Sequence, residues 1–69
     1  MFGKTLWLLR RENKLSQKKL GEMIGASRSA VNFWEMDAYN PSLKYIKKIE
    51  DVLKIKFCIT YKKQKKETL

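Results

Sequence analysis

The stretch that decides the fold is SQKKLGEMIGASRSAVNFWE, residues 16–35, in which two short segments of helical pattern follow one another closely. Ser16 is a favourable N-cap for the first segment, and Gly25 stands where that helix must end, since glycine readily adopts the left-handed conformation of a helix C-terminus. Ser27 then offers a second N-cap. The chain is therefore expected to end one helix at Gly25 and begin another at once.

The apolar residues of these two segments predict how the helices pack. They recur at the spacing of a helix side that faces a core, with Leu20, Met23 and Ile24 in the first segment and Ala30, Val31 and Trp34 in the second. Segments this short can join these side chains in one cluster only by crossing steeply, and Gly21 leaves room for a close approach. Such a pair exposes the first turn and outer side of the second helix. This is the geometry of a helix-turn-helix, whose second helix enters the major groove of DNA, about 12 Å wide.

Two further helices complete the predicted fold. Residues 4–13 carry Leu6 and Leu9 with Trp7 and Leu8 beside them, an apolar arc wider than one buried side needs. Pro41 and Ser42 open a fourth helix, whose apolar positions are Leu43, Ile46, Ile49, Val52 and Leu53. The sequence thus predicts an all-α, four-helix bundle over residues 1–53.

Composition narrows the classes of function. The 69 residues carry a net charge of +9, which favours a polyanionic partner, nucleic acid first, although such a surplus can also simply keep a small protein in solution. One cysteine and no histidine exclude an internal disulfide, a zinc cluster from one chain and a histidine-dependent catalytic triad. No pair of side chains has the spacing of a nucleophile, an acid-base couple or metal ligands, so neither an enzyme nor a cofactor is expected. No run of about 18 apolar residues and no cleavage site is present, which predicts a cytoplasmic protein without a membrane partner.

The last part of the chain follows a different pattern. Residues 54–69 hold six lysines and one glutamate, and their apolar residues alternate as in a strand. A lone strand needs a partner for its backbone, so we expect antiparallel pairing with the same strand of a second copy, laid over Trp7. The residues expected in this dimer interface are Trp7, Ile55, Phe57, Cys58, Ile59 and Tyr61. A disordered basic tail is the alternative.

The run LRRENKLSQKKLGEMIGASRSAVNFWEMDAYNPSLKYIKKIEDVL resembles the lambda-repressor-like helix-turn-helix family of the XRE type, which includes phage repressors and Cro proteins. The matching features are LSQxxLG, IGxSRSxVxxWE and NPSLxxxxKIxxxL, in register. The resemblance implies a fold of four or five helices, double-stranded operator DNA as the partner, a symmetric homodimer and, usually, repression.

The resemblance also implies roles for individual residues. Positions matching those that contact base edges are Arg28, Ser29, Asn32 and Phe33, and positions matching phosphate contacts are Gln17, Lys18, Ser27, Tyr39, Asn40 and Lys44. Arg28 suits guanine O6 and N7, and Asn32 suits adenine. Phe33 suits a thymine methyl group, or else it folds back onto Tyr39 or Leu43. Arg10 and Glu35 match a buried ion pair between the first and third helices.

One residue of the turn after the third predicted helix departs from the pattern of the family. Relatives usually have glycine where this chain has Asp37, a residue that tolerates the left-handed region better than most. The expected function is a dimeric repressor that presents two helices, residues 27–35, to half-sites about 34 Å apart. The alternative is an antitoxin whose main role is to bind a toxin protein.

Overall fold

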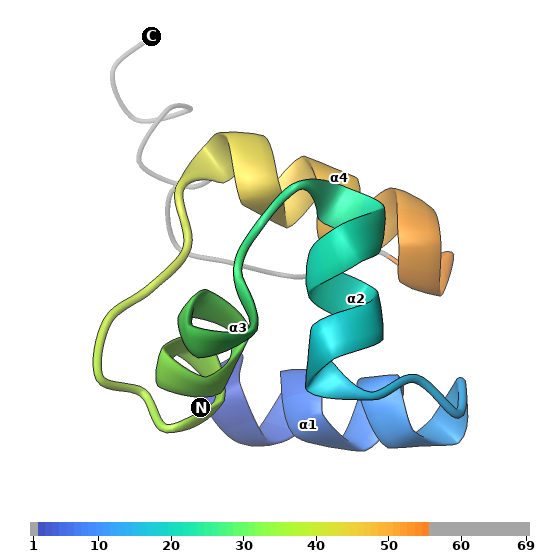
Figure 1. Ribbon diagram of the computed structural model, residues 1–69, viewed down its shortest axis with the longest axis horizontal. Helices are drawn as coiled ribbons and strands as arrows, with labels where there is room; N and C mark the ends of the chain where they lie inside the picture. The colour runs from blue at the N-terminus through green and yellow to red at the C-terminus, as the bar shows by residue number, and fades with distance from the viewer. Residues whose placement is uncertain (1, 56–69) are drawn as a thin grey trace, which may run out of the picture.

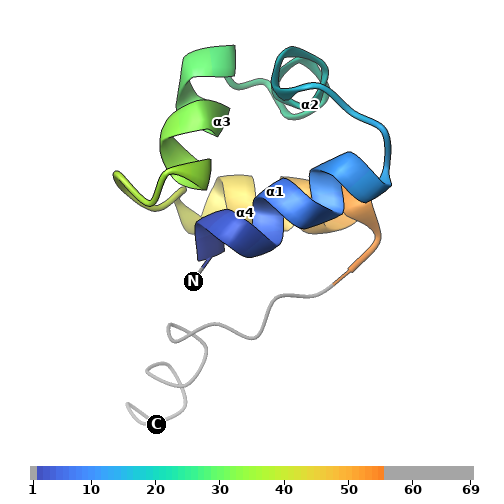
Figure 2. The same cartoon turned by 90° about the horizontal axis from the view of Figure 1, so that it is seen from below.

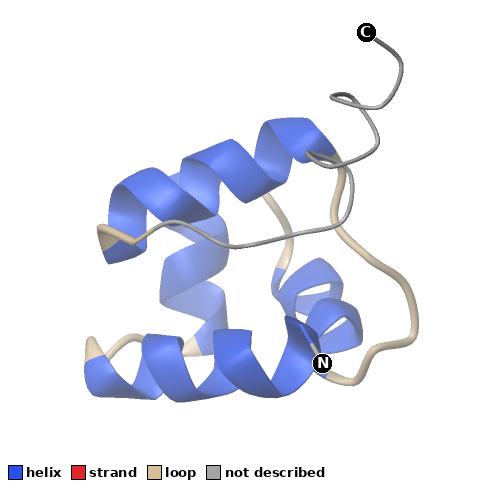
Figure 3. Ribbon diagram, turned by 180° about the vertical axis from the view of Figure 1, so that it is seen from behind, coloured by secondary structure: helices blue, strands red, loops and turns tan. Residues whose placement is uncertain are grey.

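The computed structural model describes residues 2–55, which form four helices (Figure 1): α1 (Phe2–Glu12), α2 (Gln17–Ile24), α3 (Arg28–Glu35) and α4 (Leu43–Leu53). These residues contain no strand (Figure 3), so the prediction of an all-α, four-helix bundle is confirmed for the described part of the chain. In the view of Figure 2 the α2–α3 pair lies on one side of the bundle, and α1 and α4 lie on the other.

The predicted C-terminal strand begins in the described residues, and there the prediction is wrong. Lys54 adopts a left-handed conformation with φ of 57° and ends α4. Ile55 donates its backbone N–H to the carbonyl oxygen of Glu50 at 3.1 Å and packs against the core of its own chain. The other residues of the predicted strand interface, Phe57, Cys58, Ile59 and Tyr61, lie outside the described residues.

The core draws side chains from all four helices. Its members are almost inaccessible to solvent: Leu6, Leu20, Ile24, Val31, Trp34, Ile46, Ile49 and Leu53. Burying a side chain of this size stabilises a fold by about 1.5–3 kcal/mol. The helical spacing in the sequence therefore identified the residues on which the bundle depends.

Local sequence signals set the ends of α2 and the start of α3. The Ser16 hydroxyl accepts a hydrogen bond from the N–H of Lys19 at 2.9 Å, and the Ser27 hydroxyl accepts one from the N–H of Ala30 at 3.0 Å. Gly25 has a φ of 77°, a left-handed conformation that costs a residue with a side chain about 1–2 kcal/mol. The two predicted caps and the glycine stop are confirmed.

The helices α2 and α3 cross steeply, as their lengths require. Figure 1 shows α3 nearly end-on while α2 lies in the plane of the picture, and Figure 2 shows the reverse. A Cβ atom on Gly21 would lie 2.6 Å from the carbonyl oxygen of Ala26 and 3.3 Å from the carbonyl carbon of Ser27. Glycine is therefore needed at this position because the backbone of the turn itself touches α2.

Three large apolar side chains of α1 and α2 are exposed. Met23 is 49% exposed, so its prediction as an inward residue of α2 is wrong; the buried residues of this short helix are Leu20, Gly21 and Ile24. On α1, Trp7 is 40% and Leu8 is 44% exposed. The wide apolar arc of α1 therefore exceeds what its own core covers.

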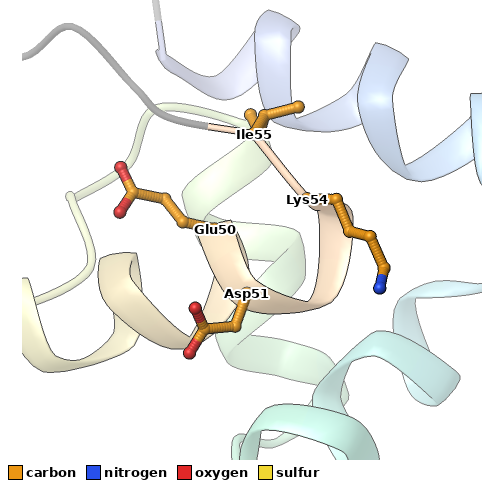
Figure 4. Close-up of a pocket in the computed structure, with 4 residues that line it drawn as sticks. All are labelled: Glu50, Asp51, Lys54 and Ile55. Atoms are coloured by element: carbon orange, nitrogen blue, oxygen red, sulfur yellow. The ribbon is translucent and has the colours of Figure 1, made fainter.

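A shallow depression lies at the C-terminal end of α4 (Figure 4). Its volume is about 280 Å³, and it is lined by Glu50, Asp51, Lys54 and Ile55. None of the residues expected to contact DNA lines it. Among residues 2–55, no helix is long and apolar enough to cross a membrane.

Candidate nucleic-acid interface

The helix α3 is anchored at its C-terminal end and exposed at its beginning. In Figure 2 its last turn lies near α1, whereas its first turn is the end farther from α1 and α4. Arg28 and Ser29, in that first turn, are both exposed. The structure thus leaves the two residues at the start of the predicted base-contacting set free of the protein core.

The anchor of α3 is an ion pair with α1. The Nε atom of Arg10 donates to Glu35 Oε2 at 2.6 Å, and its Nη2 donates to Glu35 Oε1 at 3.2 Å, with only 10% and 5% of the two side chains exposed. The Nη1 atom of Arg10 donates to the carbonyl oxygen of Leu15 at 2.7 Å. One guanidinium therefore ties together α1, the segment before α2 and the end of α3, in the two-pronged geometry that arginine forms with a carboxylate.

Gln17 is turned towards α3 in this structure. Its Nε2 atom donates to Glu35 Oε1 at 3.0 Å and to Asn32 Oδ1 at 3.2 Å. A side-chain amide has two hydrogens, so both are used within the protein. In this conformation the Gln17 side chain has no hydrogen left for the predicted contact with a DNA phosphate. The backbone N–H at the start of α2 is left to bind the phosphate.

Asn32 and Phe33 are in contact with neighbouring side chains. Asn32 is half-buried, and its Nδ2 atom donates to the sulfur of Met36 at 3.4 Å. The ring of Phe33 lies 5.4 Å from that of Tyr39, centroid to centroid, which is the folded-back alternative for this residue. Phe33 is still 38% exposed and Tyr39 55% exposed, so the aromatic pair has a free surface.

Two lysines of α4 lie beside Tyr45, whose hydroxyl reaches the turn between α2 and α3. Tyr45 donates its hydroxyl to the carbonyl oxygen of Gly25 at 3.4 Å, and the Nζ atoms of Lys44 and Lys48 lie 5.9 and 5.8 Å from its ring centroid. Lys48 was not among the sequence-predicted contacts. Its position four residues after Lys44 was the available signal, because residues so spaced share one side of a helix.

The remaining predicted phosphate contacts are accessible. The exposed residues are Lys18, Ser27, Tyr39, Asn40 and Lys44. Ser27 accepts a hydrogen bond as the cap of α3, and its hydroxyl hydrogen remains a donor.

The exposed charges on and after α3 are mainly positive. From Ser27 to Ile49 the acidic residues are Glu35 and Asp37, and each accepts hydrogen bonds, Glu35 from Arg10 and Gln17 and Asp37 from the backbone N–H of Gly3. The basic residues of the same interval are Arg28, Lys44, Lys47 and Lys48, all of them exposed. A surface with exposed cations and hydrogen-bonded carboxylates attracts the phosphates of a nucleic acid.

Comparison of the sequence with protein families agrees with the helix-turn-helix arrangement of α2 and α3. A protein-family model described as helix-turn-helix matches residues 8–59, which is most of the chain and includes α2, α3 and α4. A search of curated proteins gave no match. The chain belongs to the Cro/C1-type, lambda-repressor-like helix-turn-helix family of DNA-binding regulators.

Proposed function

We propose that this protein is a sequence-specific transcriptional repressor that binds a palindromic operator as a dimer, with α3 in the major groove. The observation that carries the proposal is the exposed first turn of α3, bearing Arg28 and Ser29, on a helix whose other end is anchored through Glu35. A rigidly held helix with a polar, cationic leading turn suits base recognition because the anchor limits its movement in the groove.

In this proposal residues of α3 contact the bases, and residues of several elements contact the phosphates. Arg28 donates to guanine O6 and N7, a two-pronged contact that discriminates between bases by about 1–3 kcal/mol. Ser29 and the free edge of Phe33 contact neighbouring bases. Phosphates are bound by Lys18, Ser27, Tyr39, Asn40 and Lys44, with Lys48 added from its place beside Tyr45.

The binding test compares two exposed cations with different roles. Arg28→Ala is expected to relax the base preference at one operator position, measured by selecting bound sites from random DNA. Lys44→Ala is expected to weaken binding to all sequences. It should also reduce the slope of log affinity against log salt concentration by about one. Unchanged operator affinity and preference in Arg28→Ala would contradict the assignment of base contact to Arg28.

The proposed dimer uses the apolar side of α1 that the core leaves uncovered. Trp7 and Leu8 are exposed, and a second copy that covers them would enlarge the small core of each subunit. The alternating apolar residues after Ile55 are a second candidate for this contact, on sequence grounds alone. If Trp7 and Leu8 alone form the contact, a chain ending at Ile55 should sediment as a dimer like the full chain. A monomer of the shorter chain beside a dimer of the full chain would instead place residues 56–69 in the interface.

The same exposed apolar residues favour one other candidate function, an antitoxin that binds a toxin protein. Trp7 and Leu8 would then contact a different chain. A toxin-sized reading frame adjacent to the gene would favour this alternative, and a stable complex of the two purified products would establish it. An operator-bound dimer without any such partner would favour the repressor.

A further inference from the structure

A chain of hydrogen bonds sets the orientation of the side-chain amide of Asn32. The Arg10 side chain has only donors and the Glu35 carboxylate has only acceptors. Their contact therefore fixes which atom donates and which accepts in each following hydrogen bond of the series. The atom of Gln17 that lies 3.0 Å from Glu35 Oε1 must then be the donor, Nε2. Since the same Nε2 lies 3.2 Å from Asn32, the Asn32 atom that faces it must be the acceptor, Oδ1.

The opposite end of that amide, Nδ2, lies on the exposed side of α3. The contact of Oδ1 with Gln17 is part-buried, whereas the contact of Nδ2 with the sulfur of Met36 is exposed and is 3.4 Å long. Thioether sulfur is a weak acceptor, and Met36 is 64% exposed. A stronger acceptor brought by DNA is therefore able to take over the Nδ2 hydrogens without breaking the contact with Gln17.

We propose that Gln17 is a positioning residue that holds Asn32 with its donor end outward, so that Asn32 selects a keto base, guanine or thymine. This inference rests on the proposed function and replaces the expectation that Asn32 recognises adenine. Adenine recognition by asparagine requires an amide that both accepts from N6 and donates to N7. Here Gln17 already engages the accepting atom.

The chemistry of the base edges supports this assignment. In the major groove guanine presents O6 and N7 and thymine presents O4, all acceptors, whereas cytosine presents only an amino donor and adenine presents an amino donor beside one acceptor, N7. A donor-only side chain faces an unfavourable donor-to-donor contact at cytosine, and at adenine it can bond N7 only while leaving the neighbouring N6 amino group without an acceptor. One such hydrogen bond corresponds to a preference of about fivefold.

The experiment measures base preference at the operator position that Asn32 contacts. Selection of bound sites with the wild-type protein and with Asn32→Ala identifies this position as the one whose preference Asn32→Ala abolishes. The wild-type protein is expected to favour guanine or thymine there by about fivefold. In Gln17→Met the amide of Asn32 is free to turn over, so the preference is expected to fall to less than about twofold, with adenine and cytosine admitted.

Two further variants separate positioning from general damage. Lys18→Met, next to Gln17 in α2 and exposed, is the matched control; it should weaken binding to all sequences and leave the preference at this position unchanged. Asn32→Asp keeps an acceptor for Gln17 but exposes a second acceptor, so it should invert the preference towards adenine or cytosine. Thermal unfolding of each variant verifies that the bundle is intact.

The possible results distinguish this inference from the proposed function. A wild-type preference for adenine, an unchanged preference in Gln17→Met or Asn32→Asp, or no position that responds to Asn32→Ala would overturn the role of Asn32 and Gln17. In each of these cases an altered preference in Arg28→Ala would leave the proposed function standing. If the wild-type protein enriches no sequence at all, both proposals fail.

Discussion

The backbone N–H of Gly3 donates to the carboxylate of Asp37 at 3.0 Å, which fastens the turn after α3 to the first turn of α1. The carboxylate thereby satisfies one of the free N–H groups at the beginning of α1, where the helix dipole also favours a negative charge. Asp37 does this with a φ of 60°, in the left-handed region, as its tolerance of that region predicted. The residue therefore combines two roles, a turn and a helix cap from outside the helix.

We expect Asp37→Ala to lower the free energy of unfolding by about 1–2 kcal/mol, because it removes the cap and places a residue of poor left-handed tolerance in the turn. Urea denaturation monitored by helical circular dichroism measures this loss. Asp37→Asn keeps an acceptor and tolerates the conformation, so it should retain most of the stability. Asp51→Ala, at an exposed site, is the control; an equal loss in both alanine variants would contradict the role given to Asp37.

Gly21→Ala is expected to destabilise the protein by about 1–3 kcal/mol, although alanine is the better helix former. The reason is the carbonyl oxygen of Ala26, 2.6 Å from where the new methyl group would lie. Thermal unfolding measures the effect, and loss of operator binding at a temperature where the variant is still helical would show that the α2–α3 crossing has changed. Glu22→Ala, at the next and exposed position, should leave stability nearly unchanged; a stable Gly21→Ala would refute the close approach.

Removing one partner of the Arg10–Glu35 pair is expected to cost about 3–5 kcal/mol, since the remaining charge is left almost fully buried. This is a large part of the stability of a small domain, so Arg10→Met and Glu35→Leu should each remain folded by only a narrow margin near room temperature. The double variant should recover part of the lost stability because neither charge remains. Denaturant unfolding of the four proteins forms a double-mutant cycle, in which additive losses would mean that the pair is not coupled.

Lys14→Gly is expected to stabilise the protein by up to about 1 kcal/mol. Lys14 has a φ of 59° in the connection after α1, a conformation that glycine adopts without steric cost. Lys47→Gly, at an exposed position in the middle of α4, should instead lose about 1 kcal/mol through lower helix propensity. The midpoints of urea unfolding compare the two, and the same sign of change in both would argue against left-handed strain at Lys14.

The sequence predicted the parts of the fold that depend on neighbouring residues. Ser16, Gly25 and Ser27 cap helices through contacts with residues a few positions away, so their roles follow from short-range geometry. Met23 shows where spacing alone failed: α2 is so short that Leu20 and Ile24 already occupy its buried side. For Trp7 and Leu8, the prediction of an apolar arc on α1 wider than its buried side needs is confirmed, because both side chains are exposed.

The candidate site was predicted only in part. The sequence placed Arg28 and Ser29 in the first turn of a helix, and their exposure follows from that position. It did not predict that Gln17 would donate to Asn32 and Glu35, since these residues are 15 and 18 positions apart and meet only after α2 and α3 have crossed. Lys48 was missed because its proximity to the turn depends on how α4 packs against α2.

By itself, then, the sequence determined four helices, the caps at Ser16, Gly25 and Ser27 and the apolar residues of the core, because these follow from hydrogen bonds and spacing within a few residues along the chain. The tertiary structure alone decided which polar atoms meet, and so which end of the Asn32 amide faces outward. The physical reason is that a hydrogen bond across helices depends on distances of a few tenths of an ångström, which are set by the packing of all four helices together and by no single segment.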